Sequence, residues 1–141
     1  MSAGPTPSWH CRRQRWTKHD VAAGSDDQVM RRAGELIQEA VTAWPGVEAV
    51  PHRFGGIEYR YGRKEMGHVH GDRLADLPLP RKLRDELIGA GRAEPHHVLP
   101  DTGWVSWWMR GPDDAPGVIE LFRLQYERYA AAAALRQRQR Y

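Results

Sequence analysis

Residues 57–72, Ile-Glu-Tyr-Arg-Tyr-Gly-Arg-Lys-Glu-Met-Gly-His-Val-His-Gly-Asp, decide the fold of this chain. The first five residues alternate apolar or aromatic side chains with charged ones, a pattern typical of a strand with one buried face. Gly62 then begins a short turn, which predicts a hairpin with a second strand directly beside the first. Because side chains on a strand point alternately to its two faces, His68 and His70 leave the same face of that second strand.

The segments on either side of this hairpin also have the sequence pattern of short strands. Between Val47 and Leu77, short extended pieces are separated by glycines such as Gly55-Gly56. An antiparallel meander is the arrangement that short strands with tight turns favour. Farther along, residues 103–111 are rich in tryptophan and bounded by turn residues, so we expect them to add a strand.

A helix is expected before these strands. Apolar residues recur at helical spacing between residues 29 and 44, and Asp26 or Asp27 can cap the free N–H groups at the start. Residues 44–46, Trp-Pro-Gly, end this helix, because the residue before a proline avoids the helical conformation.

Two more helices are expected in the second half. Residues 81–90 predict a short helix with Gly91 just past its end. For the last helix, Asp113 or Asp114 is the expected cap, and Pro116 lies in the first turn, where a proline needs no N–H partner.

These elements predict a single α+β domain of two layers, in which an antiparallel sheet of about four to six strands has the N- and C-terminal helices packed on one face. A chain of 141 residues is long enough for one domain and too short for two ordinary ones. We expect a flexible N-terminal arm over residues 1–24, the domain over residues 25–129, and a helical, basic C-terminal extension over residues 130–141.

Composition limits the classes of protein to which the chain can belong. With 40% hydrophobic and 28% charged residues it falls in the globular range, and no apolar run approaches the roughly 20 residues of a membrane span. The N-terminus lacks the apolar centre of a secretory signal, so the expected location is cytoplasmic. Cys11 is alone and forms no intramolecular disulfide. Much of the net charge of +3 comes from arginines near the two ends, which is a weak indication of a nucleic-acid partner.

Four histidines are candidates for a functional site: His68, His70, His96 and His97. Imidazole binds divalent transition metals through a neutral nitrogen, and two imidazoles two residues apart on a strand lie side by side. His96 and His97 are adjacent, so in an extended segment they point to opposite sides. We expect His97 to join the first pair and His96 to face outward, which predicts a divalent metal at His68, His70 and His97.

Other residues near this pair are candidates for ligand binding. Glu65 and Asp72 flank the histidines closely enough to accept hydrogen bonds from them or to act as acid or base partners. Trp104 and Trp108 lie on one face of the tryptophan-rich strand and Trp107 lies on the other. Core packing is the commoner role of a tryptophan on a strand, but both faces cannot be core. At least one of these rings should therefore line a surface or a groove.

Two other interpretations of the histidine pair stay open. The side chains are also consistent with ordinary solvated residues on the exposed face of a sheet. Gly62, followed by five residues and His-Val-His, reproduces the first half of the cupin metal motif. However, the cupin glutamate is missing, because positions 74 and 75 are Leu and Ala, and the second cupin motif is absent.

Several kinds of chemistry have no support in the sequence. Ser106 lacks the Gly-x-Ser-x-Gly elbow of a serine nucleophile. Gly55-Gly56 lacks the Lys-Ser/Thr ending of a phosphate-binding loop. No flavin or nucleotide motif is present, so the cofactor, apart from the candidate metal, is unknown.

Five runs of sequence together resemble a known family. They are Arg53-Phe54-Gly55-Gly56-Ile57-Glu58, Gly67-His68-Val69-His70-Gly71-Asp72, Leu77-Pro78-Leu79-Pro80, His96-His97-Val98-Leu99-Pro100 and Gly103-Trp104-Val105-Ser106. In this combination, over roughly residues 28–129, the chain resembles the small bacterial "luciferase family protein" or luciferase domain family. The resemblance implies that the family's marked residues fall on His68, His70, Asp72, His97, Gly103 and Trp104. The chain does not resemble the flavin-dependent bacterial luciferases or the adenylating beetle enzymes.

More distantly, the order of elements resembles the small double-wing α+β proteins that are described as DNA binders. This likeness bears on architecture, since one fold hosts many functions. The long, arginine-rich C-terminal extension is a departure from the shared pattern.

The sequence leaves two functions of different classes. The first and favoured one is a small-molecule or metal-binding domain that uses the His-x-His face, with the question of enzyme activity open. The second is a binding module for nucleic acid or a protein that uses the aromatic face and the basic tails. A light-emitting oxidation rests on the family label alone, and the sequence indicates neither the substrate nor the oligomeric state.

Overall fold

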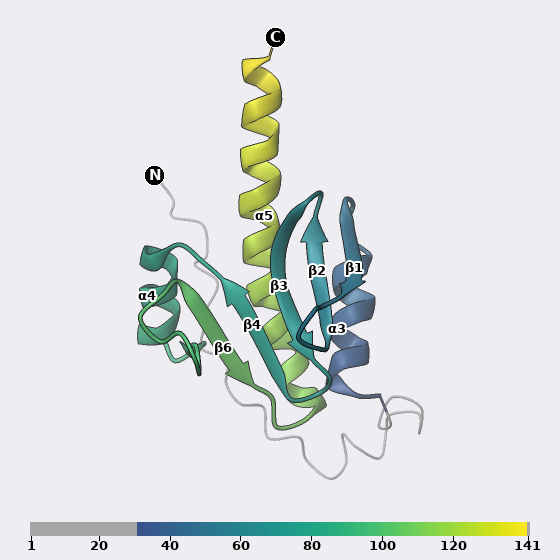
Figure 1. Ribbon diagram of the computed structural model, residues 1–141, viewed down its shortest axis with the longest axis vertical. Helices are drawn as coiled ribbons and strands as arrows, with labels where there is room; N and C mark the ends of the chain where they lie inside the picture. The colour runs from purple at the N-terminus through teal and green to yellow at the C-terminus, as the bar shows by residue number, and fades with distance from the viewer. Residues whose placement is uncertain (1–30, 141) are drawn as a thin grey trace, which may run out of the picture. The chain divides into compact units, whose positions relative to one another are not determined.

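The computed structural model of the chain describes residues 31–140, which form an α+β domain (Figure 1). The elements follow in the order α3, four strands, α4, two strands, the 3₁₀ helix η1 and α5. The arm expected over residues 1–24 and the caps expected at Asp26 or Asp27 lie outside the described residues.

Six strands form one antiparallel sheet in the order β1-β2-β3-β4-β6-β5. The first four strands lie in chain order, which confirms the meander predicted between residues 47 and 77. The strands are β1 (Val47–Pro51), β2 (Ile57–Tyr61), β3 (Lys64–His70), β4 (Leu74–Pro78), β5 (Glu94–Pro95) and β6 (Trp104–Trp108).

The hairpin of β2 and β3 has the predicted tight turn. Tyr61 pairs with Lys64 across it, and Gly62 has φ of 62°, in the left-handed region that favours glycine. A register shift in the middle of the hairpin leaves Met66 of β3 without an opposite residue in β2. This is a β-bulge, which bends a strand and changes the direction of the side chains beside it.

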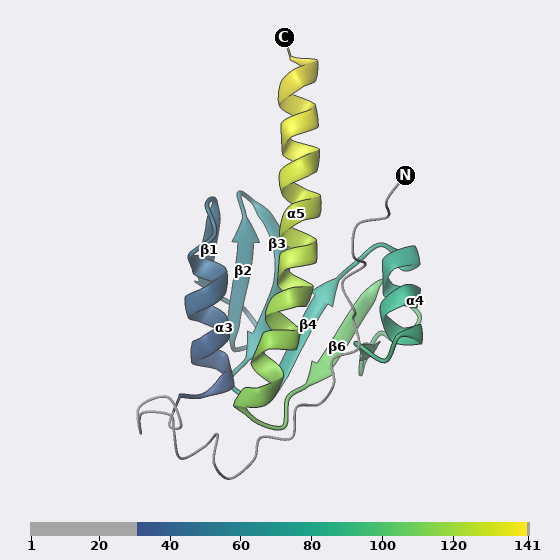
Figure 2. The same ribbon diagram turned by 180° about the vertical axis from the view of Figure 1, so that it is seen from behind.

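The two long helices, α3 (Ala33–Thr42) and α5 (Ala115–Gln139), cover the same face of the sheet, as predicted (Figure 2). Apolar side chains from both helices and from the sheet form the core, and the ring of Phe122 meets the ring of Tyr59 edge to face at 5.4 Å. Gly67 of β3 lies directly below α5. A Cβ there would lie 2.7 Å from Asp76 O and 3.0 Å from the ring of Phe122, so the close approach of helix and sheet requires glycine.

The N-terminal helix begins later than the apolar periodicity predicts. Arg31 and Arg32 are not helical, and α3 starts at Ala33. The N–H of Gly34 in its first turn donates to Asp72 Oδ1 at 2.9 Å, so the partner comes from the turn between β3 and β4. Within the described residues, a residue distant in sequence thus satisfies an N–H group in the first turn of this helix.

The remaining helices lie where they were predicted, with one difference in capping. The short helix α4 spans Arg81–Gly89, and Pro116 lies in the first turn of α5. The 3₁₀ helix η1 (Pro112–Asp114) precedes α5, and Asp114 Oδ2 accepts a hydrogen bond from Arg110 N at 2.7 Å instead of from a helix N–H. The helix α5 continues past the sheet to Gln139 (Figure 1). Within residues 31–140, no helix combines the length and the apolar character needed to cross a membrane.

Candidate functional site

The sheet face opposite the two helices carries ionisable side chains. On β3, Val69 packs in the core, so its neighbours His68 and His70 lie on the open face. Register places Asp76 of β4 opposite His68, and Ser106 of β6 opposite Asp76. Three adjacent strands therefore bring these side chains into one row.

Asp76 is the centre of this cluster and is only 1% exposed. Its Oδ2 atom lies 3.2 Å from Nε2 of His68 and 3.8 Å from Nε2 of His70. The two rings are 5.0 Å apart and nearly perpendicular, with an interplanar angle of 80°. The nitrogens of both therefore approach the same oxygen from different directions.

The other carboxylate oxygen of Asp76 has its own set of partners. Ser106 Oγ donates to Oδ1 at 2.6 Å. Two imidazoles from the segment after β5 also face Oδ1, with His96 Nε2 and His97 Nδ1 each at 3.7 Å. Four imidazoles thus surround a single buried carboxylate.

Glu65 fixes the orientation of His68, since its Oε1 lies 2.8 Å from His68 Nδ1. Both ring nitrogens of His68 therefore face carboxylates. Burial lowers the pKa of His68, but hydrogen bonds to Asp76 and Glu65 and their negative charges outweigh it and raise this pKa to about 9. Without a metal ion, His68 is an imidazolium that donates a proton to each side.

The neighbouring groups titrate in the opposite direction. Burial lowers the pKa of His70, and the positive charge of His68 lowers it further. Burial raises the pKa of Asp76, but hydrogen bonds from His68 and Ser106 and the charges nearby bring the pKa below its usual value. At neutral pH His70 is therefore neutral with a free lone pair, and Asp76 is ionised.

Helix α5 holds the segment of β3 that carries Glu65. Tyr129 Oη donates to Glu65 O at 2.8 Å, and the buried amide of Gln125 donates to Met66 O at 3.2 Å and also to Pro78 O. The bonds to Glu65 O and Met66 O satisfy backbone carbonyls at the β-bulge, where regular pairing is interrupted. The helix on one face therefore fixes a carboxylate that acts on the other.

Three groups of residues in the described part of the chain have ligand atoms close enough to share a metal ion. The first is His68, His70 and Asp76, whose ligand atoms lie within 4.8 Å of one another. Two ligand atoms bound to one tetrahedral ion are about 3.4 Å apart, because each bond is about 2.1 Å long. The separations of 3.2 and 3.8 Å from Asp76 Oδ2 lie close to that value.

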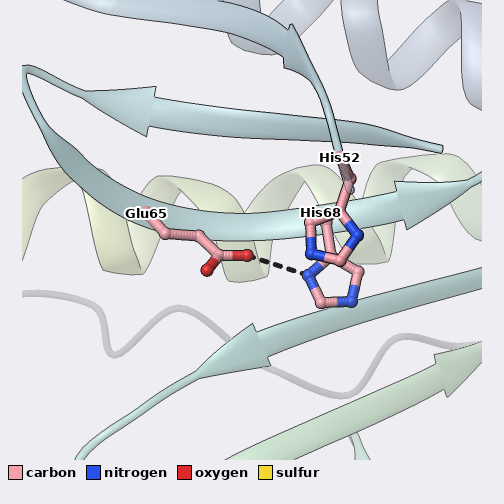
Figure 3. A group of neighbouring side chains, drawn as sticks. All are labelled: His52, Glu65 and His68. Atoms are coloured by element: carbon pink, nitrogen blue, oxygen red, sulfur yellow. Dashed lines mark hydrogen bonds and ion pairs between the residues drawn. The ribbon is translucent and has the colours of Figure 1, made fainter. Parts of the chain in front are cut away.

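The second group is His52, Glu65 and His68 (Figure 3). The rings of His52 and His68 are stacked, with centroids 4.1 Å apart and an interplanar angle of 21°. The nitrogen lone pairs lie in the ring planes, so lone pairs of stacked rings run parallel and do not converge on one ion. In addition, His52 Nδ1 accepts a hydrogen bond from Phe54 N at 3.3 Å. We therefore assign His52 to packing against His68.

The third group is Asp76, His96 and His97. His96 Nδ1 accepts the backbone N–H groups of Val98 and Leu99, at 3.1 and 3.0 Å, so the proton of the neutral ring is on Nε2, the atom facing Asp76. Burial lowers the pKa of His96, which favours this neutral ring. Such a nitrogen has no lone pair to offer a metal.

His97 has a similar constraint. Ser106 gives its one proton to Asp76, so the contact of 3.2 Å between Ser106 Oγ and His97 Nδ1 requires His97 to donate. His97 Nδ1 is then a donor in the hydrogen-bonded row. The side chain as a whole is about one third exposed.

The structure brings together most of the residues that the sequence singled out. His68, His70 and Glu65 are in the cluster, and Trp104 lies beside it, with its ring 5.4 Å from that of His68. His97 faces the opposite oxygen of Asp76 from the pair, and its role as a metal ligand stays a prediction. Trp108 is 50% exposed, so a tryptophan does line this surface as expected.

One expectation about the site is corrected, and Asp72 has contacts outside the cluster while its role in ligand binding stays a prediction. His96 does not face outward, because the chain bends after β5 and the alternation of an extended strand no longer applies; its ring is buried with Nε2 toward Asp76. Asp72 caps α3 through Gly34 and contacts Arg32 at 3.8 Å, so the structure gives it a structural contact.

Sequence reasoning missed Asp76 and His52. Asp76 is the one charged residue of β4, Leu-Ala-Asp-Leu-Pro, and a lone carboxylate in an apolar strand is a signal that could have identified it. For His52, which follows β1 and reaches His68 by stacking, the local sequence contains no comparable signal.

Comparison with protein families matches residues 63–125 to the family model described as Luciferase domain, as the resemblance indicated. The matched segment begins in the turn before β3 and ends within α5, so it includes Asp76 and the four imidazoles around it. Searches of curated proteins and of solved structures found no match to this chain. The chemistry of the site therefore has to be argued from its geometry.

Proposed function

We propose that this chain, whose residues 63–125 match the Luciferase domain family model, binds a divalent transition-metal ion between His68, His70 and Asp76. The ligand atoms are Nε2 of the two imidazoles and Oδ2 of the carboxylate. Two histidines and one carboxylate on one side of an ion are a donor set that suits Fe²⁺ and Zn²⁺ and leaves coordination positions open.

The observation that supports this proposal most directly is the convergence of both Nε2 atoms on one oxygen, at 3.2 and 3.8 Å. The nearly perpendicular rings of His68 and His70 allow this convergence, whereas the rings of His52 and His68 are stacked. His70 is neutral and offers its lone pair at neutral pH. An ion at this point replaces the proton that His68 shares with Asp76.

Glu65 supports the same arrangement. It accepts the Nδ1 proton of His68, which leaves Nε2 of that ring for the ion and raises its basicity. The contact is preorganised, because Tyr129 holds the backbone carbonyl of Glu65 from α5. Ser106 similarly fixes the carboxylate of Asp76 from the opposite side.

The chemistry that such an ion supplies is the polarisation of a bound oxygen. An ion with open positions lowers the pKa of a bound water or activates a carbonyl of a ligand. The side chain of His97, which is about one third exposed, lies in the same row through its contact with Ser106. A small-molecule or metal-binding domain is thus the function that the geometry supports best.

Metal content of protein purified without a histidine tag tests this proposal. After incubation with Zn²⁺, Mn²⁺ or Fe²⁺ and removal of excess, mass spectrometry should find one ion per wild-type chain and a loss of at least tenfold in Asp76→Asn, since a ligand is removed. Asp72→Asn is the matched control, because it changes a nearby aspartate that caps α3, and it should retain the ion.

Equal metal content in the two variants, or no stoichiometric ion in the wild type with any of the three metals, would contradict the proposal. Binding of nucleic acid or a protein through the basic tails stays a prediction from the sequence. Light emission has no support beyond the family label.

A further inference from the structure

We propose that the open positions of this ion take an aromatic molecule that carries two adjacent oxygen donors and a negative charge. This inference rests on the proposed metal site and adds the class of its ligand. It combines the distribution of exposed apolar side chains, the row of side chains beside the ion and the charge of the donor set.

Large apolar side chains gather around the histidines. Among the residues that the structure describes, the strongly exposed ones are Phe54, Val98, Leu99, Trp108 and Leu135. Phe54 and Trp108 lie beside histidine rings, and Val98 and Leu99 follow His97 directly in the chain. The ring of Phe54 is 5.6 Å from that of His52, the ring of Trp108 is 5.5 Å from that of His97, and the N–H groups of Val98 and Leu99 donate to His96.

Leu74 is an apolar side chain paired in register with His70, one of the proposed metal ligands. It is buried but is not part of the helix-side core, and two residues before Asp76 on β4 it shares the open face. Register places it between His70 of β3 and Trp108 of β6. The side chains His70, Leu74 and Trp108 therefore follow one another across three strands, leading from a proposed metal ligand to an exposed indole.

The row of His70, Leu74 and Trp108 favours a flat, aromatic ligand. An aromatic body that lies against Trp108, beside the strand position of Leu74, buries apolar area and gains ring contacts with the half-exposed indole. Its oxygen atoms then reach the ion beside His70.

The charge of the donor set selects an anion. Two neutral imidazoles and one carboxylate leave a divalent ion with one positive charge toward its open side. Glu65 does not directly cancel the positive charge of the ion, because its carboxylate contacts Nδ1 of His68, on the side of the ring away from Nε2. A hydroxybenzoate or a singly ionised catechol has the matching charge and geometry.

Titration of the cobalt-loaded protein tests the inference, because the visible spectrum of Co²⁺ reports both its binding and the exchange of its ligands. The probes are salicylate and lactate, which both offer a carboxylate and an adjacent oxygen but differ in the ring. Equilibrium dialysis checks that the ion stays on the protein. The measured quantity is the ratio of the two dissociation constants in the wild type and in each variant, which removes the intrinsic difference between the chelators.

Trp108→Ala should weaken salicylate by about tenfold and leave lactate unchanged, because only the aromatic ligand contacts the indole. Leu135→Ala is the matched control, since it removes an exposed apolar side chain of α5 far along the chain, and it should change neither ligand. Phe54→Ala offers a second site for the same test at a residue that is 73% exposed.

The inference is overturned, with the metal site intact, if Co²⁺ binds and the ratio is the same in the wild type, Trp108→Ala and Phe54→Ala. It is also overturned if these variants change a monomer–dimer equilibrium and not the ratio, because a second copy of the chain then covers the apolar surface. Absence of any Co²⁺ spectrum overturns the metal site and the ligand together.

Discussion

The two faces of the sheet use the same strands for different purposes. The face toward α3 and α5 is apolar, and its side chains contribute by the area that they bury. The open face places four imidazoles around Asp76, each with one nitrogen within 3.8 Å of a carboxylate oxygen. Strand β3 serves both, because Val69 packs in the core while His68 and His70 lie on the other side. Because side chains alternate between the two faces of a strand, the residues that stabilise the fold are separated from the candidate binding residues. Substitutions on the helix face should therefore change stability more than substitutions on the open face.

The largest expected effect is on the helix face. Phe122 is fully buried and packs on Tyr59, so Phe122→Ala should lower the free energy of unfolding by about 3–5 kcal/mol, through lost burial and a cavity. Urea denaturation followed by circular dichroism measures this loss. A loss below about 1 kcal/mol would show that the α5 side chains are not the core of the domain.

An intermediate effect is expected from pH in the metal-free protein. The folded pKa of His68 is about 9, above its usual 6.5, so its stabilising contribution is complete below pH 6.5 and is lost as pH rises to about 9. The loss is on the order of 3 kcal/mol, from 1.36 kcal/mol per unit of pKa. The pKa values of His70 and His96 are lowered, so they titrate below this window.

His68→Gln is the control for this pH series, since glutamine keeps hydrogen-bonding capacity without a titrating ring. Denaturation midpoints between pH 6 and pH 10 should fall in the wild type and change much less in the variant. If the midpoints of the two proteins changed with pH in parallel, the charge of His68 would not stabilise the folded state, and the prediction would be contradicted.

The smallest expected effect on stability is at the apolar rim of the open face. Phe54 is 73% exposed, so Phe54→Ala should change the free energy of unfolding by no more than about 0.5 kcal/mol. The same urea denaturation, run beside Phe122→Ala, gives the comparison between one exposed and one buried phenylalanine. If Phe54→Ala approached the loss of Phe122→Ala, the rim would be part of the structural core and the division between the faces would fail.

The sequence predicted the frame of the domain through local patterns. Alternation in residues 57–61 and the glycine turn after them are short-range signals, and they correctly placed the His68 strand beside its partner. The period of the flanking helices likewise indicated which residues face the sheet. Each of these predictions depends on residues close together in the chain, where the backbone alone determines which side chains share a face.

The centre of the site could not be predicted in the same way. The pairing of His68 with Asp76 depends on the register of β3 with β4, which the turn after His70 fixes and which the sequence does not specify. The burial of His96 depends on a bend after a strand of two residues. The contact of Asp72 with α3 joins residues 38 positions apart. All three are results of tertiary packing.

The hydrogen bonds from α5 to the β-bulge have a practical consequence for how the protein is handled. Tyr129 holds the backbone at Glu65 and lies just before the part of α5 that continues to Gln139. A bulky protein fused directly after that helix, or immobilisation of the helix on a surface, would transmit force through Tyr129 to Glu65, the residue that orients His68. Affinity measurements on this protein should therefore use a C-terminus without a fused protein or a surface attachment.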